Sequence, residues 1–270
     1  MKKKLSFEEK RERVSRMQMI NDVFLQKMAE DKGVCEEIIQ TVLGDKTISV
    51  VESNPQMPLK NIFGRSVILD VLCKDSYGRY FNVEVQNADN DNHIRRVRYN
   101  GACVTTNIVD AGEKFELVPD VVVIYISAFD LFEKGKTVYR ATMKLDDTFE
   151  DVNDGFVAYY INTVVDDKST IAELMKCFKD SKYLTSSNFP KCFQRNKFLK
   201  ENQEGVSSMC GVVEEIYKEG KLEGQLKGKL ENLLDLVEDG ILTEDDAIQR
   251  SGVTPEEYFS YKKEWEESKE

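Results

Sequence analysis

The chain has 270 residues, of which 41% are hydrophobic and 32% charged, a composition typical of a globular protein and not of a disordered one. No apolar run approaches the length of a membrane span, and charged residues follow the basic start Met-Lys-Lys-Lys, so we expect no signal peptide. The formal net charge of −11 argues against a nucleic-acid partner. However, residues 213–270 hold 17 acidic and 8 basic residues, so the rest of the chain is nearly neutral and has room for a basic patch.

The cysteines are scattered along the chain without any Cys-x-x-Cys pair. This spread predicts free thiols in a reducing cytoplasm, and it disfavours disulfides and structural zinc. We therefore expect a cytoplasmic protein. The six residues are Cys35, Cys73, Cys103, Cys177, Cys192 and Cys210.

The first fifth of the chain is predicted to be mostly helical. Ser6-Phe-Glu-Glu9 is a capping-box pattern, and apolar residues at helical spacing predict one helix from there to about Ala29. A second helix is expected from Gly33 to Gly44. Thr47–Val51 is typical of a first strand, and Asn54-Pro-Gln-Met-Pro58 is expected to be a loop.

Two alternating segments, 66–74 and 80–86, flank the turn residues Asp75-Ser-Tyr-Gly78 and predict a β-hairpin. A three-residue loop with Gly78 in the left-handed conformation would place Asp70 directly opposite Glu84 on one face. Opposed carboxylates destabilise a sheet unless a cation lies between them. The hairpin therefore predicts a site for a hard divalent cation such as Mg²⁺.

The remaining elements before residue 205 complete an α/β pattern. Asp89-Asn-Asp-Asn92 is expected to begin a helix that carries Arg95, Arg96, Arg98 and Tyr99, with His93 as a surface residue at its start. The hydrophobic run to Ile126 predicts a buried central strand. Two strands are expected next, at the sheet's edge, over residues 138–143 and 156–161. Two helices follow them, one from Thr170 and one over residues 189–199. The order αβββαβ predicts a mixed central sheet flanked by helices.

The C-terminal part is helical and different in kind. Glycines at every fourth position, Gly220, Gly224 and Gly228, would line one face of a helix and let another helix approach closely, as in a homodimer. A solvated helical linker explains the repeat equally well. Acidic helices follow, whose glutamates would repel DNA phosphates. We expect a core domain over residues 1–204, the repeat helix over 205–232 and a small acidic tail over 233–270.

Taken together, these motifs resemble the PD-(D/E)xK nuclease superfamily, and specifically its bacterial recombination-promoting nucleases, also described as transposases. The resemblance covers about residues 15–230 and implies a restriction-endonuclease-like core. The motifs that carry it are Asn21-Asp22-Val-Phe24, Ile68-Leu-Asp-Val-Leu72, Phe81-Asn-Val-Glu-Val-Gln86, Arg96-Val-Arg-Tyr99 and the Gly-Lys-Leu-Glu-Gly repeat.

The resemblance implies an endonuclease that cleaves DNA with Mg²⁺, or with another divalent cation such as Mn²⁺. Asp70, Glu84 and the backbone carbonyl of Val85 would bind the metal. Gln86 occupies the superfamily's lysine position, where it can orient water but supplies no positive charge. Asp22 would be an additional acidic group at the site.

The positive charge that Gln86 lacks would come from Arg96 or Arg98 on the following helix, where Arg95 and Tyr99 are also candidates for phosphate contact. A lysine that the family carries shortly after Phe24 is absent, since Leu25-Gln-Lys27 stands there. Two alternatives stay open: a catalytically degenerate nuclease fold that acts as a dimeric binding or regulatory module, and an acidic tail that inhibits by mimicking DNA.

Overall fold

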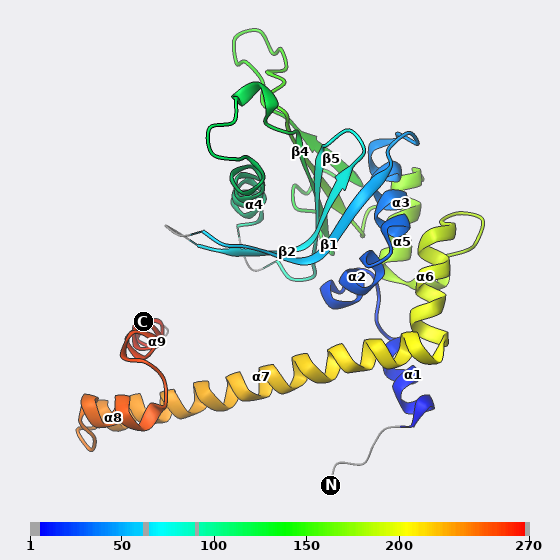
Figure 1. Ribbon diagram of the computed structural model, residues 1–270. Helices are drawn as coiled ribbons and strands as arrows, with labels where there is room; N and C mark the ends of the chain where they lie inside the picture. The colour runs from blue at the N-terminus through cyan, green and yellow to red at the C-terminus, as the bar shows by residue number, and fades with distance from the viewer. Residues whose placement is uncertain (1–5, 62–64, 90–91, 268–270) are drawn as a thin grey trace. The chain divides into compact units, whose positions relative to one another are not determined.

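Six strands form one mixed sheet in the spatial order β1-β2-β3-β4-β6-β5, shown in the computed structural model in Figure 1. The structure describes residues 6–61, 65–89 and 92–267, except for the side chains of residues 215–217, 219, 220, 223 and 264. β3, β4 and β6 are mutually parallel, and the other pairings are antiparallel. The strands are β1 (Val50–Leu59), β2 (Val67–Asp75), β3 (Tyr80–Gln86), β4 (Val121–Ser127), β5 (Val138–Ala141) and β6 (Phe156–Asn162).

Helices cover both faces of the sheet, which confirms the expected α/β architecture. α4 (His93–Ile108) packs on one face, and the other face is covered by helices from both ends of the domain (Figure 1). These are α2 (Asp22–Ala29), α3 (Lys32–Leu43), α5 (Thr170–Lys179) and α6 (Pro190–Glu201), and α1 (Phe7–Ser15) packs against α6. The 3₁₀ turns η1 (Phe115–Leu117) and η2 (Ser181–Tyr183) lie in the connections.

The single N-terminal helix that we expected is wrong, because the chain forms two helices, α1 and α2. The capping box at Ser6 is present, but the backbone leaves the helix after Arg16. The Asn21 side chain accepts a hydrogen bond from the Gln18 N–H at 2.8 Å, and the Ile20 N–H donates to the Phe178 carbonyl at 3.1 Å. These bonds replace helical ones and set the direction of α2.

The expected loop at Asn54–Pro58 is also wrong, because these residues belong to β1. Pro55 lies opposite Val71 and Pro58 opposite Ile68. A proline removes one ladder donor, which an edge strand tolerates because only one of its sides is paired. β1 is such an edge strand.

The hairpin has the predicted register. Val71 pairs with Val83, and Leu72 pairs with Asn82. The turn is closed by the Asp75 N–H, which donates to the Arg79 carbonyl at 3.0 Å, and Gly78 has φ +84°. This φ is the left-handed conformation that glycine adopts without strain.

Two further differences concern single elements, whereas the cysteines agree with the expectation. β6 lies between β4 and β5, so of the two strands that we expected at the sheet's edge only β5 is an edge strand. α5 is capped by Ser169, whose hydroxyl accepts from the Ala172 N–H, and not by Thr170. All six cysteines are buried and free, as their scatter predicted.

The chain divides into two compact units, residues 1–210 and 211–270. α7 (Gln203–Glu238) is one continuous helix that includes both the glycine repeat and the segment after it, and α8 (Glu244–Ser251) and α9 (Pro255–Glu267) follow. The second unit has its own small core around Leu234, Ala247 and Tyr258. Within the described residues, no helix is both long and apolar enough to cross a membrane.

Candidate active site

The two acidic residues of the hairpin lie in contact where the β2–β3 ladder ends. Glu84 is 1% exposed, and its Oε1 accepts a hydrogen bond from the Asp70 N–H at 3.3 Å. Asp70 is half-buried, and its Oδ2 accepts from the Val85 N–H at 2.9 Å. The last backbone pair before them is Val71 with Val83, so the Asp70 carboxylate takes the place of a main-chain partner for Val85. The hairpin therefore holds two carboxylates together on rigid strands.

This arrangement raises the pKa of both carboxyl groups. Burial, followed by the charge of Asp70, raises the pKa of Glu84 to about 8, and the Arg96 guanidinium opposes the rise. Burial also raises the pKa of Asp70 to about 6, against the hydrogen bond from Val85, which lowers it. Both directions follow from desolvation and from the repulsion between like charges.

Arg96 connects the carboxylate pair to Gln86. Its Nη1 donates to the Gln86 Oε1 at 3.1 Å, and its Nη2 lies 3.7 Å from the Glu84 Oε2. The Gln86 amide also donates from Nε2 to the Ala88 carbonyl at 2.8 Å, which fixes its orientation. The two side chains of β3 therefore share one guanidinium group from α4.

α2 brings two further side chains to Asp70. Asp22, at the start of this helix, raises the pKa of Asp70 through its negative charge, whereas Gln26 lowers it through a side-chain hydrogen bond. Asp22 was a candidate from the sequence, but Gln26 was not. The available signal was the spacing, because residues four apart lie on the same face of a helix.

The chemistry of these groups fits a hard divalent cation. The Glu84 Oε2 is buried and has no hydrogen-bond partner among the described residues. A buried carboxylate oxygen without a partner, next to a second carboxylate, would be stabilised by a cation. Mg²⁺ commonly uses one or two carboxylates and keeps several waters. Nowhere in the described part of the chain do three or more His, Cys, Asp or Glu side chains form a group that could hold a metal, so Asp70 and Glu84 would act as a pair.

A comparison of the sequence with models of protein families identifies the family of this chain. Residues 22–176, which include Asp22, the hairpin and Arg96, match the model of the PD-(D/E)XK nuclease family transposases. The chain belongs to this family. No match was found among curated proteins or among solved structures. The resemblance of the motifs is thereby confirmed over more than half of the chain.

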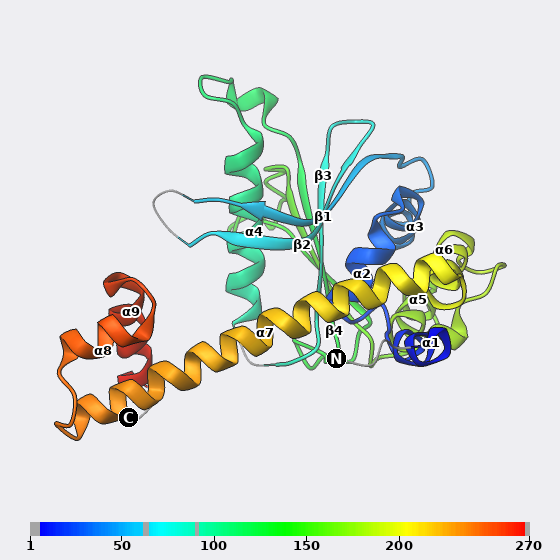
Figure 2. The ribbon, with the colours of Figure 1, turned by 60° about the horizontal axis from the view of Figure 1, so that its bottom comes forward.

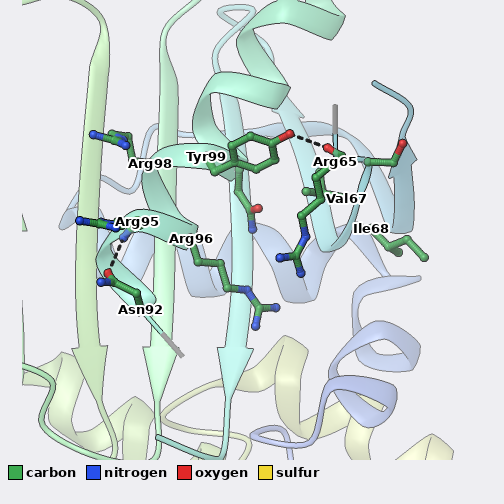
Figure 3. Close-up of a pocket in the computed structure, with 10 residues that line it drawn as sticks. Arg65, Val67, Ile68, Asn92, Arg95, Arg96, Arg98 and Tyr99 are labelled. Atoms are coloured by element: carbon green, nitrogen blue, oxygen red, sulfur yellow. Dashed lines mark hydrogen bonds between the residues drawn. The ribbon is translucent and has the colours of Figure 1, made fainter. Parts of the chain in front are cut away.

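In this PD-(D/E)XK family member, a basic cavity of about 600 Å³, drawn in Figure 3, shares Arg96 with the site of the carboxylate pair. In Figure 3 the side chains of Arg65 and Arg96 point toward the lower part of the view, whereas those of Arg95 and Arg98 point to the left, away from them. Arg65, which we did not consider from the sequence, lies just before β2. The cavity is lined by Arg65, Ser66, Val67, Ile68, Asn92, Arg95, Arg96, Arg98, Tyr99 and Asn100.

Tyr99 fastens the end of the β1–β2 hairpin to α4. Its hydroxyl donates to the Arg65 carbonyl at 2.5 Å and accepts from the Asn61 amide at 3.4 Å. In Figure 2 the two strands extend past α4 at this point. This contact holds Arg65 near the arginines of α4. The arginine-lined wall of the cavity is therefore formed by two segments, the one before β2 and α4.

His93 differs from our expectation of a surface residue. It is 2% exposed, with its Nδ1 2.7 Å from the Tyr125 hydroxyl and its Nε2 3.0 Å from the Asp89 Oδ1. The expectation failed because a polar residue at a helix start has no sequence signal for burial until the partner strand is known.

Proposed function

We propose that the chain is a metal-dependent endonuclease that hydrolyses phosphodiester bonds of DNA and acts in recombination or in the movement of mobile elements. The observation that carries this proposal is the contact of Asp70 with Glu84 beside Arg96. Membership of the nuclease family supports it. The fit of a carboxylate pair to a hard cation, beside a cavity lined by arginines, adds chemical support.

We assign metal binding to the carboxylates of Asp70 and Glu84 and to the main-chain carbonyl of Val85. Mg²⁺ is the expected ion, with Mn²⁺ as an alternative of similar ligand preference. A bound ion of this kind supplies polarisation of the scissile phosphate and a lower pKa of bound water. Rigid strands hold the ligands, so little reorganisation is needed when charge develops.

The other roles fall to residues around this pair. Gln86 orients the attacking water through its amide, which is itself held by Arg96 and Ala88. Arg96 supplies the positive charge that a lysine at position 86 would bring, and it stabilises negative charge on the phosphate. Asp22 adds a further acidic group from α2, beside Asp70.

DNA contact is assigned to the arginines of the basic cavity. Arg95, Arg96 and Arg98 on α4, with Arg65 from the adjoining hairpin, are suited to phosphate oxygens because a guanidinium group can donate two parallel hydrogen bonds. Tyr99 would have two roles in the same cavity. It positions Arg65 through the hydrogen bond to the Arg65 carbonyl, and it would contact the sugar-phosphate backbone of DNA.

Nicking of supercoiled plasmid DNA tests the proposal. The purified protein is expected to convert supercoiled DNA to open circles with Mg²⁺ or Mn²⁺, and to be inactive in excess EDTA. Asp70→Asn is the matched inactive control. Wild-type activity in Asp70→Asn would reject the site assignment. No cleavage with either ion, combined with no ion binding by calorimetry, would favour the alternative of a degenerate fold with a binding role.

Cleavage at subsaturating Mg²⁺ is expected to increase with pH. The metal binds ionised carboxylates, and the pKa of Glu84 is raised to about 8, so its ionised fraction grows from about 1% at pH 6 to about half at pH 8. At saturating Mg²⁺ the rise should move to lower pH, because the ion stabilises the charged form. Initial nicking rates from pH 6 to 9 at two Mg²⁺ concentrations measure this. Identical profiles at the two concentrations would contradict it.

We also propose that a second copy of the chain binds along the glycine repeat of α7. A side chain added at Gly224 or Gly228 would meet no atom within 4 Å, and Leu222 is 65% exposed. The surroundings of Gly220 lie outside the described residues. The open face therefore has room for a closely packed helix.

Gly224→Leu is expected to raise the dimer dissociation constant about tenfold or more, because a bulky side chain separates the two backbones. Sedimentation equilibrium over a range of concentrations measures this. Gly211→Leu is the matched control, since Gly211 is an equally open position of α7 outside the repeat. A wild-type protein that stays monomeric at high micromolar concentration would reject the dimer.

A further inference from the structure

A hydrogen-bonded network, buried except for the exposed Asp89, connects α4 to the centre of the sheet beside the candidate active site. It consists of Asp89, His93 and Tyr125, with distances of 3.0 Å and 2.7 Å to the two ring nitrogens of His93. His93 is 2% exposed and Tyr125 1% exposed, and the ring of Phe129 packs on His93 with centroids 5.0 Å apart. None of these residues has a role in the proposed chemistry.

The proton positions in neutral His93 follow from the partners. An ionised Asp89 can only accept a hydrogen bond, so the Nε2 of His93 must carry the proton that it donates. The Nδ1 then has a lone pair and accepts from the Tyr125 hydroxyl. One tautomer and one ring orientation are therefore selected, which gives the first turn of α4 a defined rotation above the sheet.

Two connections link these hydrogen-bonded residues to the candidate active site. Along the sheet, Tyr125 is the register neighbour of Glu84. Along α4, Arg96 lies one turn after His93, and its guanidinium reaches back to Gln86 and Glu84 on β3. β3, β4 and the first turn of α4 are thus joined in a closed loop of contacts, in which Arg96 is the only member that approaches both β3 side chains.

We propose that Tyr125 and His93 are positioning residues that hold the Arg96 guanidinium against Gln86 and Glu84. Their importance for cleavage rests on the proposed function, whereas their effect on Arg96 does not. Arg96 has a long side chain that is 36% exposed, so packing alone leaves it several rotamers. A fixed first turn of α4 restricts where its Cα lies, and so which rotamers reach β3.

A double-mutant cycle tests the proposal. Tyr125→Phe is expected to lower kcat for plasmid nicking about 10- to 100-fold, the range found when residues that orient catalytic groups are removed. In an Arg96→Ala background the same change should have no further effect, because its action passes through Arg96. Tyr160→Phe is the matched control. Tyr160 is the buried neighbour of Tyr125 on β6, and its ring packs edge-on against Tyr125.

Several outcomes overturn the proposal. Equal losses in Tyr125→Phe and Tyr160→Phe would show a general packing effect. Losses that multiply in the double variant would show that Tyr125 acts independently of Arg96. If Tyr125→Phe does not fold, His93→Gln enters the same cycle, since its amide can keep one of the two hydrogen bonds.

A second measurement does not need enzyme activity. The Nε–H group of Arg96 is observed by NMR relaxation in the metal-free protein, and its order parameter should fall in Tyr125→Phe but not in Tyr160→Phe. An unchanged order parameter rejects the positioning role. If the order parameter falls in Tyr125→Phe but the wild-type protein never cleaves DNA, the positioning role is supported and the nuclease function is rejected, so the two failures are distinguishable.

Discussion

Glu84→Gln is expected to abolish DNA cleavage and at the same time to stabilise the metal-free protein. Loss of a metal-binding carboxylate should lower kcat by about 10³-fold or more, comparable to removal of a group that stabilises the transition state. The free energy of unfolding at pH 9 should rise by about 1–3 kcal/mol, because the variant no longer buries an ionised carboxylate whose Oε2 has no hydrogen-bond partner.

The sign of the stability change follows from the shifted pKa. The folded-state pKa of Glu84 is raised to about 8, above its value of about 4.3 in an unfolded chain. The folded state therefore binds the proton more tightly, and wild-type stability decreases as pH rises from about 4.3 to about 8. Glu84→Gln lacks this decrease, so the two proteins should differ little at pH 4 and most at pH 9.

Urea unfolding at both pH values, with EDTA present, measures the effect. Glu52→Gln on β1 is the matched control, since Glu52 is exposed and the same charge is removed. A destabilised Glu84→Gln at pH 9 would show that Glu84 is stabilised by its partners when ionised, against the electrostatics described above.

Arg96→Ala is expected to have the second large effect, a decrease in kcat of about 10²- to 10³-fold. Arg96 is the cation that contacts Gln86 and lies 3.7 Å from the Glu84 Oε2. Its loss also removes a charge that lowers the pKa of Glu84, so the pH profile of cleavage at low Mg²⁺ should shift to higher pH.

Arg98→Ala is the matched comparison from the same helix. Arg98 lines the basic cavity but points away from Arg96 (Figure 3), so its removal should raise KM and reduce the salt dependence of DNA binding while kcat changes little. Arg96→Lys should recover only part of the lost activity, because an ammonium group cannot reproduce two donors in a fixed fork. Equal kcat losses in Arg96→Ala and Arg98→Ala would contradict a special role for Arg96.

The sequence by itself determined the features that depend on local periodicity and turn chemistry. Alternation over residues 66–86 and a glycine at position 78 were sufficient to predict the hairpin register, and with it the approach of Asp70 to Glu84. The side-chain period of a strand is two, so a turn of known length leaves one register. Gly44, which ends α3, and the apolar run of β4 were equally informative.

Only the tertiary structure decided which distant groups join this pair. Asp22 and Gln26 reach Asp70 because the first helix breaks before α2, at hydrogen bonds that include one to Phe178. Among the arginines of α4, the packing of that helix on the sheet selects Arg96 for β3, and it buries His93 against Tyr125. Helix rotation, strand-edge position and burial depend on contacts between residues far apart in the chain, which no local pattern encodes.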